Sequence, residues 1–178
     1  IDMINPELAA RDTLPPQVIK TNNALAKAWE IARETIQGGS DAWSICIATC
    51  NNEALPIERI LETCPRRLKA QKISGDCIDS PNEVVVSDLQ ALKGFEFKHV
   101  IILGCGSKQF PARGVHHDEK WRDALRLYVT LTRARDQIHL IHEGNPSEFI
   151  SAMGELVDSR EESAKLTLPM INRVRRSP

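Results

Sequence analysis

Residues 83–104 read EVVVSDLQALKGFEFKHVIILG, and this stretch contains two apolar runs separated by a short, more polar connection. Val84–Val86 and Val100–Leu103 are uninterrupted runs of β-branched residues and leucine, which is typical of strands buried on both faces of a sheet. Such strands occur in parallel sheets that are covered by helices on both sides. The stretch therefore predicts an α/β domain.

Strand-like and helical segments alternate through the rest of the chain. The pattern predicts strands at 17–20, 43–49 and 137–141, a weak strand or irregular connection at 66–75, and helices at 24–36, 53–64, 118–135 and 146–156. This alternation implies crossover connections and a mostly parallel sheet. We expect one three-layer α/β domain over residues 17–156, with a lead-in at 1–16 and a polar to basic tail at 157–178.

The composition is that of a folded domain that is not attached to a membrane. Hydrophobic residues make up 42% of the 178 residues, which excludes a disordered chain, and no apolar run approaches the roughly 20 residues of a membrane span. No secretory signal is present, so we expect a cytoplasmic location without a membrane partner. The chain begins with Ile1 instead of Met, and we interpret it as a piece of a longer protein.

No metal site is expected. The 5 cysteines lack the short paired spacings of a zinc site, and we interpret them as reduced, mostly buried side chains. His139 and His142 lie three apart on a predicted strand and therefore point to opposite faces, so they cannot easily share a metal ion. We expect these two, like His116 and His117, to be solvated loop or strand-edge side chains.

Two segments carry residue types that could act on a ligand. The first contains Lys93, Gly94 and Glu96, where the glycine allows a close backbone approach and the carboxylate can accept hydrogen bonds from a sugar. The second ends in Arg133 and Arg135 after a predicted helix. Because open α/β sheets bind ligands beyond the carboxyl ends of their strands, we expect both segments at that edge.

The residues alone leave alternatives open for both segments. Lys93–Glu96 is equally compatible with a charged surface turn. Arg133 and Arg135 could complement the negative end of the helix dipole, or one of them could present its guanidinium to a transferring phosphoryl group.

In order and spacing, the chain resembles the second RecA-like domain of UvrD/Rep-type superfamily 1 DNA helicases. Residues 84–103 are similar to helicase motif V, with its Lys-Gly-Leu-Glu core before an apolar strand. Residues 106–111, GSKQFP, resemble the Gly-x-x-x-Phe-Pro loop that follows in the family. Residues 125–135, LRLYVTLTRAR, resemble motif VI, usually Tyr-Val-Ala-Leu-Thr-Arg-Ala-Arg. The resemblance is strongest over 84–141, weaker over 17–62 and absent beyond about residue 149.

The resemblance implies a role for each matching residue. Arg133 would be the arginine finger that reaches the γ-phosphate of ATP, and Glu96 would accept a hydrogen bond from the ribose. Gly94 would allow the backbone to approach the nucleotide or the facing domain, and Lys93 would support the loop. Arg135 would be an ion-pairing or helix-end residue. In the family, ATP closes the cleft between two RecA-like domains and hydrolysis reopens it, which moves the pair along single-stranded DNA.

Two departures from the family pattern concern DNA and ATP. Asp88 and Gln90 stand where the family usually has Thr and His on the DNA side of the loop, and an acid there puts direct strand contact in doubt. The sequence also lacks a Gly-x-x-x-x-Gly-Lys-Ser/Thr loop and an Asp-Glu pair after an apolar strand. ATP and Mg²⁺ would therefore be held mainly by an N-terminal RecA-like domain outside this chain, and the chain alone would be inactive.

Three functions follow from these residues. The first is the C-terminal motor domain of an ATP-dependent DNA helicase. The second is a helicase-derived, non-catalytic module that docks DNA or protein, which the acid at Asp88 favours. The third is an unrelated α/β binding domain, in which Glu96 and Arg133 would lie on distant faces of the sheet.

Overall fold

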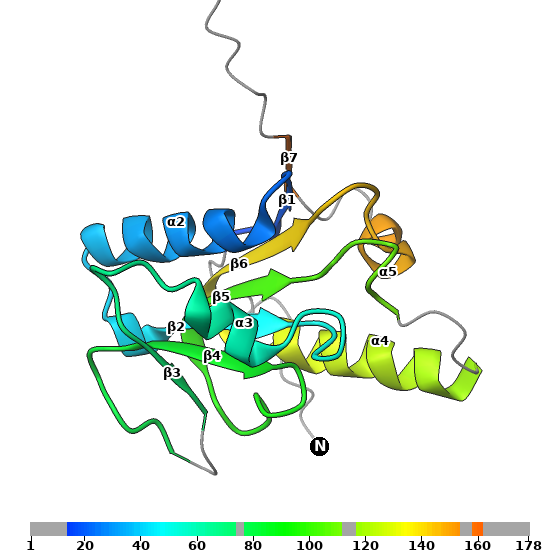
Figure 1. Ribbon diagram of the computed structural model, residues 1–178. Coiled ribbons are helices and arrows are strands. Elements are labelled where there is room, and N and C mark those ends of the chain that lie inside the picture. Colours follow the sequence, from blue (N-terminus) through cyan, green and yellow to red (C-terminus); the bar gives the residue numbers. More distant parts are fainter. Residues whose placement is uncertain (1–13, 74–76, 112–116, 154–157, 162–178) are drawn as a thin grey trace, which may run out of the picture.

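The fold is built on a seven-stranded sheet in which every strand pair is parallel (Figure 1). The computed structural model describes residues 14–73, 77–111, 117–153 and 158–161. Along the sheet the strand order is β3-β4-β2-β5-β6-β1-β7. The strands are β1 (Gln17–Lys20), β2 (Ile45–Thr49), β3 (Ala70–Lys72), β4 (Val84–Asp88), β5 (Phe97–Leu103), β6 (Ala134–His142) and β7 (Asp158–Glu161).

Helices cover both faces of the sheet, which makes the fold a three-layer α/β domain as predicted. The helices are α2 (Ala24–Gln37), α3 (Ile57–Glu62), α4 (His117–Leu131) and α5 (Glu148–Ala152), with a 3₁₀ turn at Ala42–Ser44. Residues of α2 and α3 pack in the buried cluster on one face, together with Ile101 and Leu103 of β5. Leu127 of α4 and Ile150 of α5 pack in the cluster on the opposite face.

Strand β5 explains why the apolar run at 100–103 has no polar member. Ile101 and Leu103 belong to one buried cluster, whereas Val100 and Ile102 belong to the other, and all four are fully buried. Each such side chain contributes about 1.5–3 kcal/mol through removal of its apolar surface from water. The core therefore lies on both sides of this central strand.

Some predicted boundaries are wrong. Helix α3 begins at Ile57, several residues later than expected, because Pro56 has extended backbone dihedrals and Asn52 Oδ1 accepts the Ile57 N–H at 2.9 Å. Helix α4 ends at Leu131 and β6 begins at Ala134, so Arg133 belongs to the turn between them. Helix α5 is a short helix that begins after its cap, Ser147.

The sheet extends past residue 156, where we expected the domain to end. Strand β7 pairs in parallel with β1 at the edge of the sheet, with Gln17 opposite Asp158. Part of the expected tail is therefore a strand. The rest of that tail, residues 162–178, and most of the expected lead-in, residues 1–13, lie outside the described residues.

The connections change direction between β2 and β5, which are adjacent strands. The chain leaves β2 through α3 on one face of the sheet and leaves β5 through α4 on the other face. Such a switch point opens a crevice outside the carboxyl ends of the two strands, where α/β folds commonly bind ligands.

Candidate functional site

The two segments singled out in the sequence lie side by side. Glu96 directly precedes β5 and Arg133 directly precedes β6, which is the neighbouring strand. The backbone N–H of Phe97 donates a hydrogen bond to the carbonyl oxygen of Arg133 at 2.9 Å. The fold therefore brings together the two loops that resemble motifs V and VI, and Glu96 and Arg133 do not lie on distant faces of the sheet.

Their position on the sheet differs from the expected one. Both loops lie at the amino ends of parallel strands, whereas we expected them beyond the carboxyl ends. The reason is the connection after β4, in which Leu89 and Leu92 are buried against the sheet and lead the chain back to its amino edge without a helix. Likewise, α4 brings the chain back to this edge before β6 begins.

The Arg133 side chain folds back along the last turn of α4. Its Nε donates to the carbonyl oxygen of Val129 at 3.2 Å, and the residue is half-buried. Within the described part of the chain, neither terminal guanidinium nitrogen of Arg133 has a hydrogen-bond partner or an ion pair. These nitrogens are therefore available to an anion that approaches the amino edge.

Glu96 is paired with Arg135. The Arg135 Nε lies 3.7 Å from Glu96 Oε2, and both side chains are more than half exposed. The prediction that Arg135 is an ion-pairing residue is confirmed. An exposed pair of this kind contributes about 0–1 kcal/mol to stability, so it adds little to the stability of the fold.

Gly94 is required by its backbone conformation. Its φ is +97°, a region that residues with a side chain rarely adopt, and no atom lies within 4 Å of the position a Cβ would take. The close approach expected at this glycine is therefore not made within the described chain. Lys93 lies beside it with an exposed side chain.

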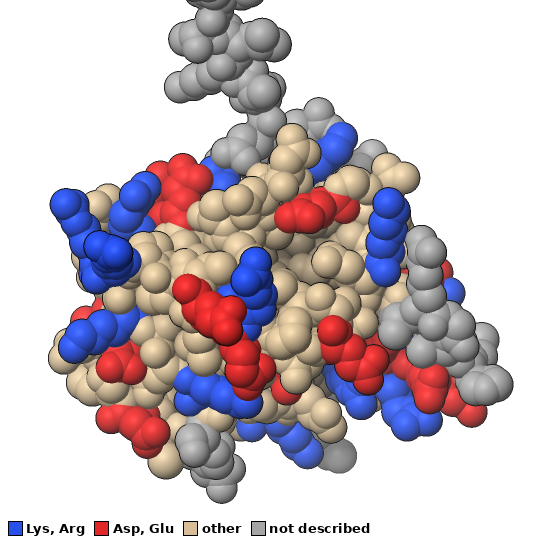
Figure 2. Space-filling model, in the orientation of Figure 1, with Lys and Arg blue, Asp and Glu red and all other residues tan. Residues whose placement is uncertain are grey.

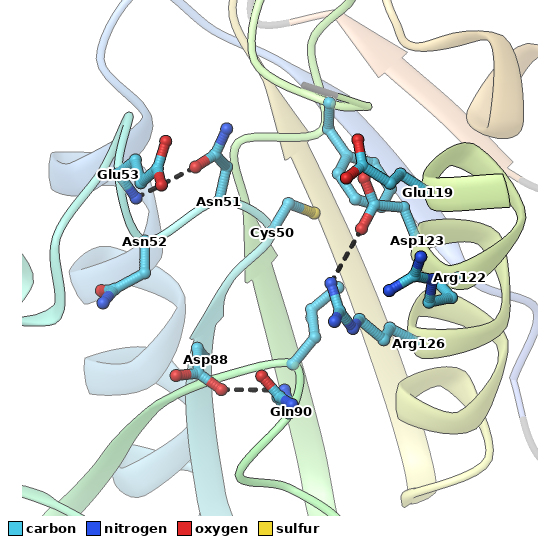
Figure 3. A pocket seen from close by; sticks show the side chains of 12 residues that line it. Cys50, Asn51, Asn52, Glu53, Asp88, Gln90, Glu119, Arg122, Asp123 and Arg126 are labelled. Carbon is cyan, nitrogen blue, oxygen red and sulfur yellow. Dashed lines mark hydrogen bonds and ion pairs between the residues drawn. The ribbon is translucent and has the colours of Figure 1, made fainter. Parts of the chain in front are cut away.

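A second candidate site is a groove at the opposite, carboxyl edge, which we call the carboxyl-edge groove (Figure 3). Its volume is about 500 Å³, and it lies at the switch point between β2 and β5. The lining includes Asp88 and Gln90, which the sequence analysis singled out as a DNA-side loop. It also includes polar side chains that no motif in the sequence indicates: Asn51, Asn52, Glu53, Glu119, Arg122, Asp123 and Arg126.

The missed residues of α4 share a spacing that could have revealed them. Glu119, Asp123 and Arg126 recur at four- and three-residue steps, which places charged side chains on one side of a helix. Asp123 and Arg126 form an ion pair at 3.1 Å (Figure 3).

Asp88 has a structural role that explains an acid at this position. Its Oδ1 accepts the backbone N–H groups of Gln90 and Ala91, both at 2.8 Å. The carboxylate therefore caps the turn that follows β4. A threonine hydroxyl, usual in the family, can accept such a bond as well.

The carboxyl-edge groove has an excess of negative charge. Four carboxylates line it, against the two guanidinium groups of Arg122 and Arg126. Phosphate groups are repelled by such a lining, whereas neutral or cationic groups are not. Figure 2 shows acidic side chains between the basic ones over the face it draws, so that face has no continuous basic stripe.

Cysteines and histidines show no arrangement for a metal. Among the residues with described positions, no three His, Cys, Asp or Glu side chains are grouped to hold an ion. Cys50 and Cys105 are both free thiols with 3.8 Å between their Sγ atoms, and burial raises the pKa of Cys50 well above its usual value.

His142 is buried, with Nδ1 3.1 Å from the Gly144 carbonyl oxygen, so the prediction that it is solvated is wrong. His116 lies outside the described residues.

Comparisons with known proteins identify the fold. The chain is similar to the crystal structure of the C-terminal domain of a possible DNA helicase from Lactobacillus plantarum WCFS1, with a TM-score of 0.65 and 18% sequence identity. The match covers 83% of this chain and 86% of that domain. A scan against family models and a search of curated proteins find no match. At this identity the likeness shows a shared α/β fold, consistent with a RecA-like domain.

No helix within the described ranges is long and apolar enough to cross a lipid bilayer.

Proposed function

We propose that this chain is the C-terminal motor domain of an ATP-dependent, UvrD/Rep-like superfamily 1 DNA helicase. The observation that carries the proposal is the juxtaposition of Glu96 and Arg133, joined through the Phe97–Arg133 backbone hydrogen bond at the amino edge. Two segments far apart in the sequence thereby lie next to each other, one with the exposed Glu96 side chain and the other with the Arg133 guanidinium. The fold shared with a possible helicase's C-terminal domain supports the same function.

In this proposal the chain completes an ATP site that another domain begins. The available guanidinium nitrogens of Arg133 fit the γ-phosphate, and the exposed carboxylate of Glu96 fits a ribose hydroxyl. ATP and Mg²⁺ would be held mainly by an N-terminal RecA-like domain, since the sequence contains no phosphate-binding loop. Bound Mg²⁺ neutralises charge that develops on the phosphates.

The partners in this proposal are the N-terminal domain and single-stranded DNA, and the motor works in the cytoplasm. The charge of the carboxyl-edge groove limits how DNA can contact this domain. Because Asp88 and its neighbouring acids repel phosphates, the strand would present bases or sugars to this groove.

The experiment that tests the proposal is Arg133→Ala in the full-length helicase. Loss of an arginine finger lowers turnover by about 10³–10⁵-fold, so DNA-stimulated hydrolysis should fall by that order while ATP binding stays nearly unchanged. Arg59→Ala is the matched control, because Arg59 is an exposed arginine on α3, on the other face of the sheet from α4. Near-normal turnover of the Arg133 variant would contradict the assignment.

A second candidate function is a non-catalytic module that docks DNA or protein after loss of the motor half. The acidic carboxyl-edge groove favours it, because its lining repels the phosphates of a DNA strand. The reading frame upstream of Ile1 distinguishes the two functions. A phosphate-binding loop followed by an Asp-Glu pair there supports the motor, and a gene encoding only these residues supports the module.

A further inference from the structure

Helix α4 exposes three large apolar side chains on one face. Trp121, Leu125 and Tyr128 are 64%, 61% and 65% exposed. They recur at four- and three-residue steps, so they form one continuous stripe about 10 Å long, which we call the α4 apolar face. Only two other large hydrophobic side chains of the described residues are exposed, Leu14 at 65% and Trp43 at 41%, and both lie outside α4.

This face is distinct from the two other faces of the helix. Leu127 and Thr130 are buried against the sheet. Arg122 and Arg126 line the carboxyl-edge groove. With about 100° between successive residues, the α4 apolar face lies on the far side of the helix from the groove. Packing among the described residues therefore does not account for the apolar residues of this face.

The α4 apolar face adjoins the proposed arginine finger. The backbone N–H of Thr132 donates to the Tyr128 carbonyl oxygen at 3.2 Å, and Arg133 Nε donates to the Val129 carbonyl oxygen at 3.2 Å. The stripe therefore ends within one helical turn of the Arg133 side chain. A domain that brings a phosphate to Arg133 would approach this end of α4.

We propose that the α4 apolar face is the docking surface for the domain that holds ATP. This inference rests on the proposed function, and it adds a surface that the helicase resemblance does not supply. Tryptophan and tyrosine are the side chains that most often dominate the energy of protein interfaces. Beside Trp121, a shallow hollow of about 370 Å³ is lined by Ala124, Phe149 and Lys120, and it can accept an apolar side chain of the partner.

The chemistry of the face fits a protein better than a nucleic acid. Surfaces that stack single-stranded bases interleave aromatic side chains with cations that follow the phosphates. Here Arg122 and Arg126 lie in the groove on the far side of the helix, and Lys120 is paired with Glu148 at 2.6 Å. The exposed residue preceding the stripe, Asp118, is an acid.

The test compares Trp121→Ser and Leu125→Ser with Trp43→Ser and Leu14→Ser in the full-length helicase. The control pair removes the same side chains from exposed positions elsewhere. We expect each α4 variant to lower the kcat/KM of DNA-stimulated ATP hydrolysis about tenfold or more, and the controls to change it less than about twofold. Hydrogen exchange in 119–129 should slow when a non-hydrolysable ATP analogue binds, and this protection should be lost in the variants.

Three outcomes would overturn the inference. The first is normal ATP turnover and unchanged hydrogen-exchange protection in both α4 variants, while Arg133→Ala abolishes hydrolysis. In that case the proposed function would stand, and the α4 apolar face would not be the docking surface. Another is loss of oligothymidine binding by the 178-residue chain carrying Trp121→Ser, which makes DNA the occupant. The third is a concentration-dependent dimer of the 178-residue chain that Leu125→Ser dissociates, which makes a second copy the occupant. Unchanged thermal unfolding of the variant chains excludes misfolding as the cause.

Discussion

Two residues determine the path of the connection between β4 and β5, which leads from the carboxyl edge of the sheet to the candidate site at the amino edge. Asp88 caps the turn after β4 with its carboxylate, and Gly94 supplies a positive φ just before β5. Between them, buried Leu92 holds the connection against the sheet. The position of Glu96 next to Arg133 therefore depends on local backbone geometry as much as on the strands.

Gly94→Ala should destabilise the domain although its Cβ would meet no neighbour. The φ of +97° costs an L residue about 1–2 kcal/mol, whereas open space adds no steric penalty. The free energy of unfolding in urea should fall by about that amount. Gly38→Ala, at a φ of −75°, is the control and should change it by less than about 0.5 kcal/mol. Equal effects at the two positions would contradict this account of Gly94.

Asp88→Ser should tighten DNA binding without unfolding the turn. The serine hydroxyl can accept the same backbone N–H groups, while one negative charge leaves the carboxyl-edge groove. The affinity of the full-length helicase for single-stranded DNA should rise a few-fold at low salt, and the gain should shrink as salt is added. Asp88→Ala serves as the comparison, because it removes the charge and the cap together. An affinity that does not respond to either change would show that no strand passes this groove.

At the scale of secondary-structure elements, the buried strands could be predicted from sequence and the connections could not. The run at 100–103 is apolar because both faces of β5 are buried, and this pattern is visible in any sequence window. The position of Arg133 depends on where α4 ends, and nothing in its apolar periodicity marks Leu131 as the last helical residue. That both candidate loops lie at the amino edge depends on the path of residues 89–96, where buried leucines replace a crossover helix.

The candidate site was partly predictable, because contiguous motifs are visible in a sequence and surfaces assembled from several elements are not. Glu96 and Arg133 stand in recognisable motifs, whereas the carboxyl-edge groove is assembled from β2, β4 and α4 and has no contiguous signature. The spacing of the charged residues Glu119, Asp123 and Arg126 is visible in the sequence. It identifies them as lining a groove only once the position of α4 beside the carboxyl end of β2 is known.

Strand β5 also carries a group that should make stability depend on pH. Burial lowers the pKa of His99, Lys98 lowers it further, and Asp136 opposes them. The unfolded chain therefore binds a proton at His99 more readily than the folded chain does. The contribution of neutral His99 to the free energy of unfolding is therefore fully present above about pH 6.5. The free energy of unfolding should fall as the pH drops from there through the lower pKa of the folded state. His99→Gln should show a shallower slope between about pH 7 and 5, and an unchanged slope would contradict this role.

At the scale of the whole molecule, the two edges of the sheet have different chemistry. The amino edge presents Arg133 and Glu96, whereas the carboxyl edge has a groove with more acids than bases. The switch point, where α/β folds commonly bind ligands, is thus unsuited to phosphates here, and the nucleotide is proposed for the opposite edge. In the proposed function, Arg133 and Glu96 contact the nucleotide and a second domain holds most of it.

The most direct test of the central claim, that Glu96 and Arg133 serve one nucleotide, is a steady-state comparison of Glu96→Ala and Arg133→Ala in the full-length helicase. A ribose contact made equally in the ground and transition states affects KM, whereas a finger that acts on the transferring phosphoryl group affects kcat. We expect Glu96→Ala to raise the KM for ATP severalfold with kcat nearly unchanged, and Arg133→Ala to lower kcat about 10³-fold or more with KM nearly unchanged. Wild-type kcat and KM in both variants would contradict it.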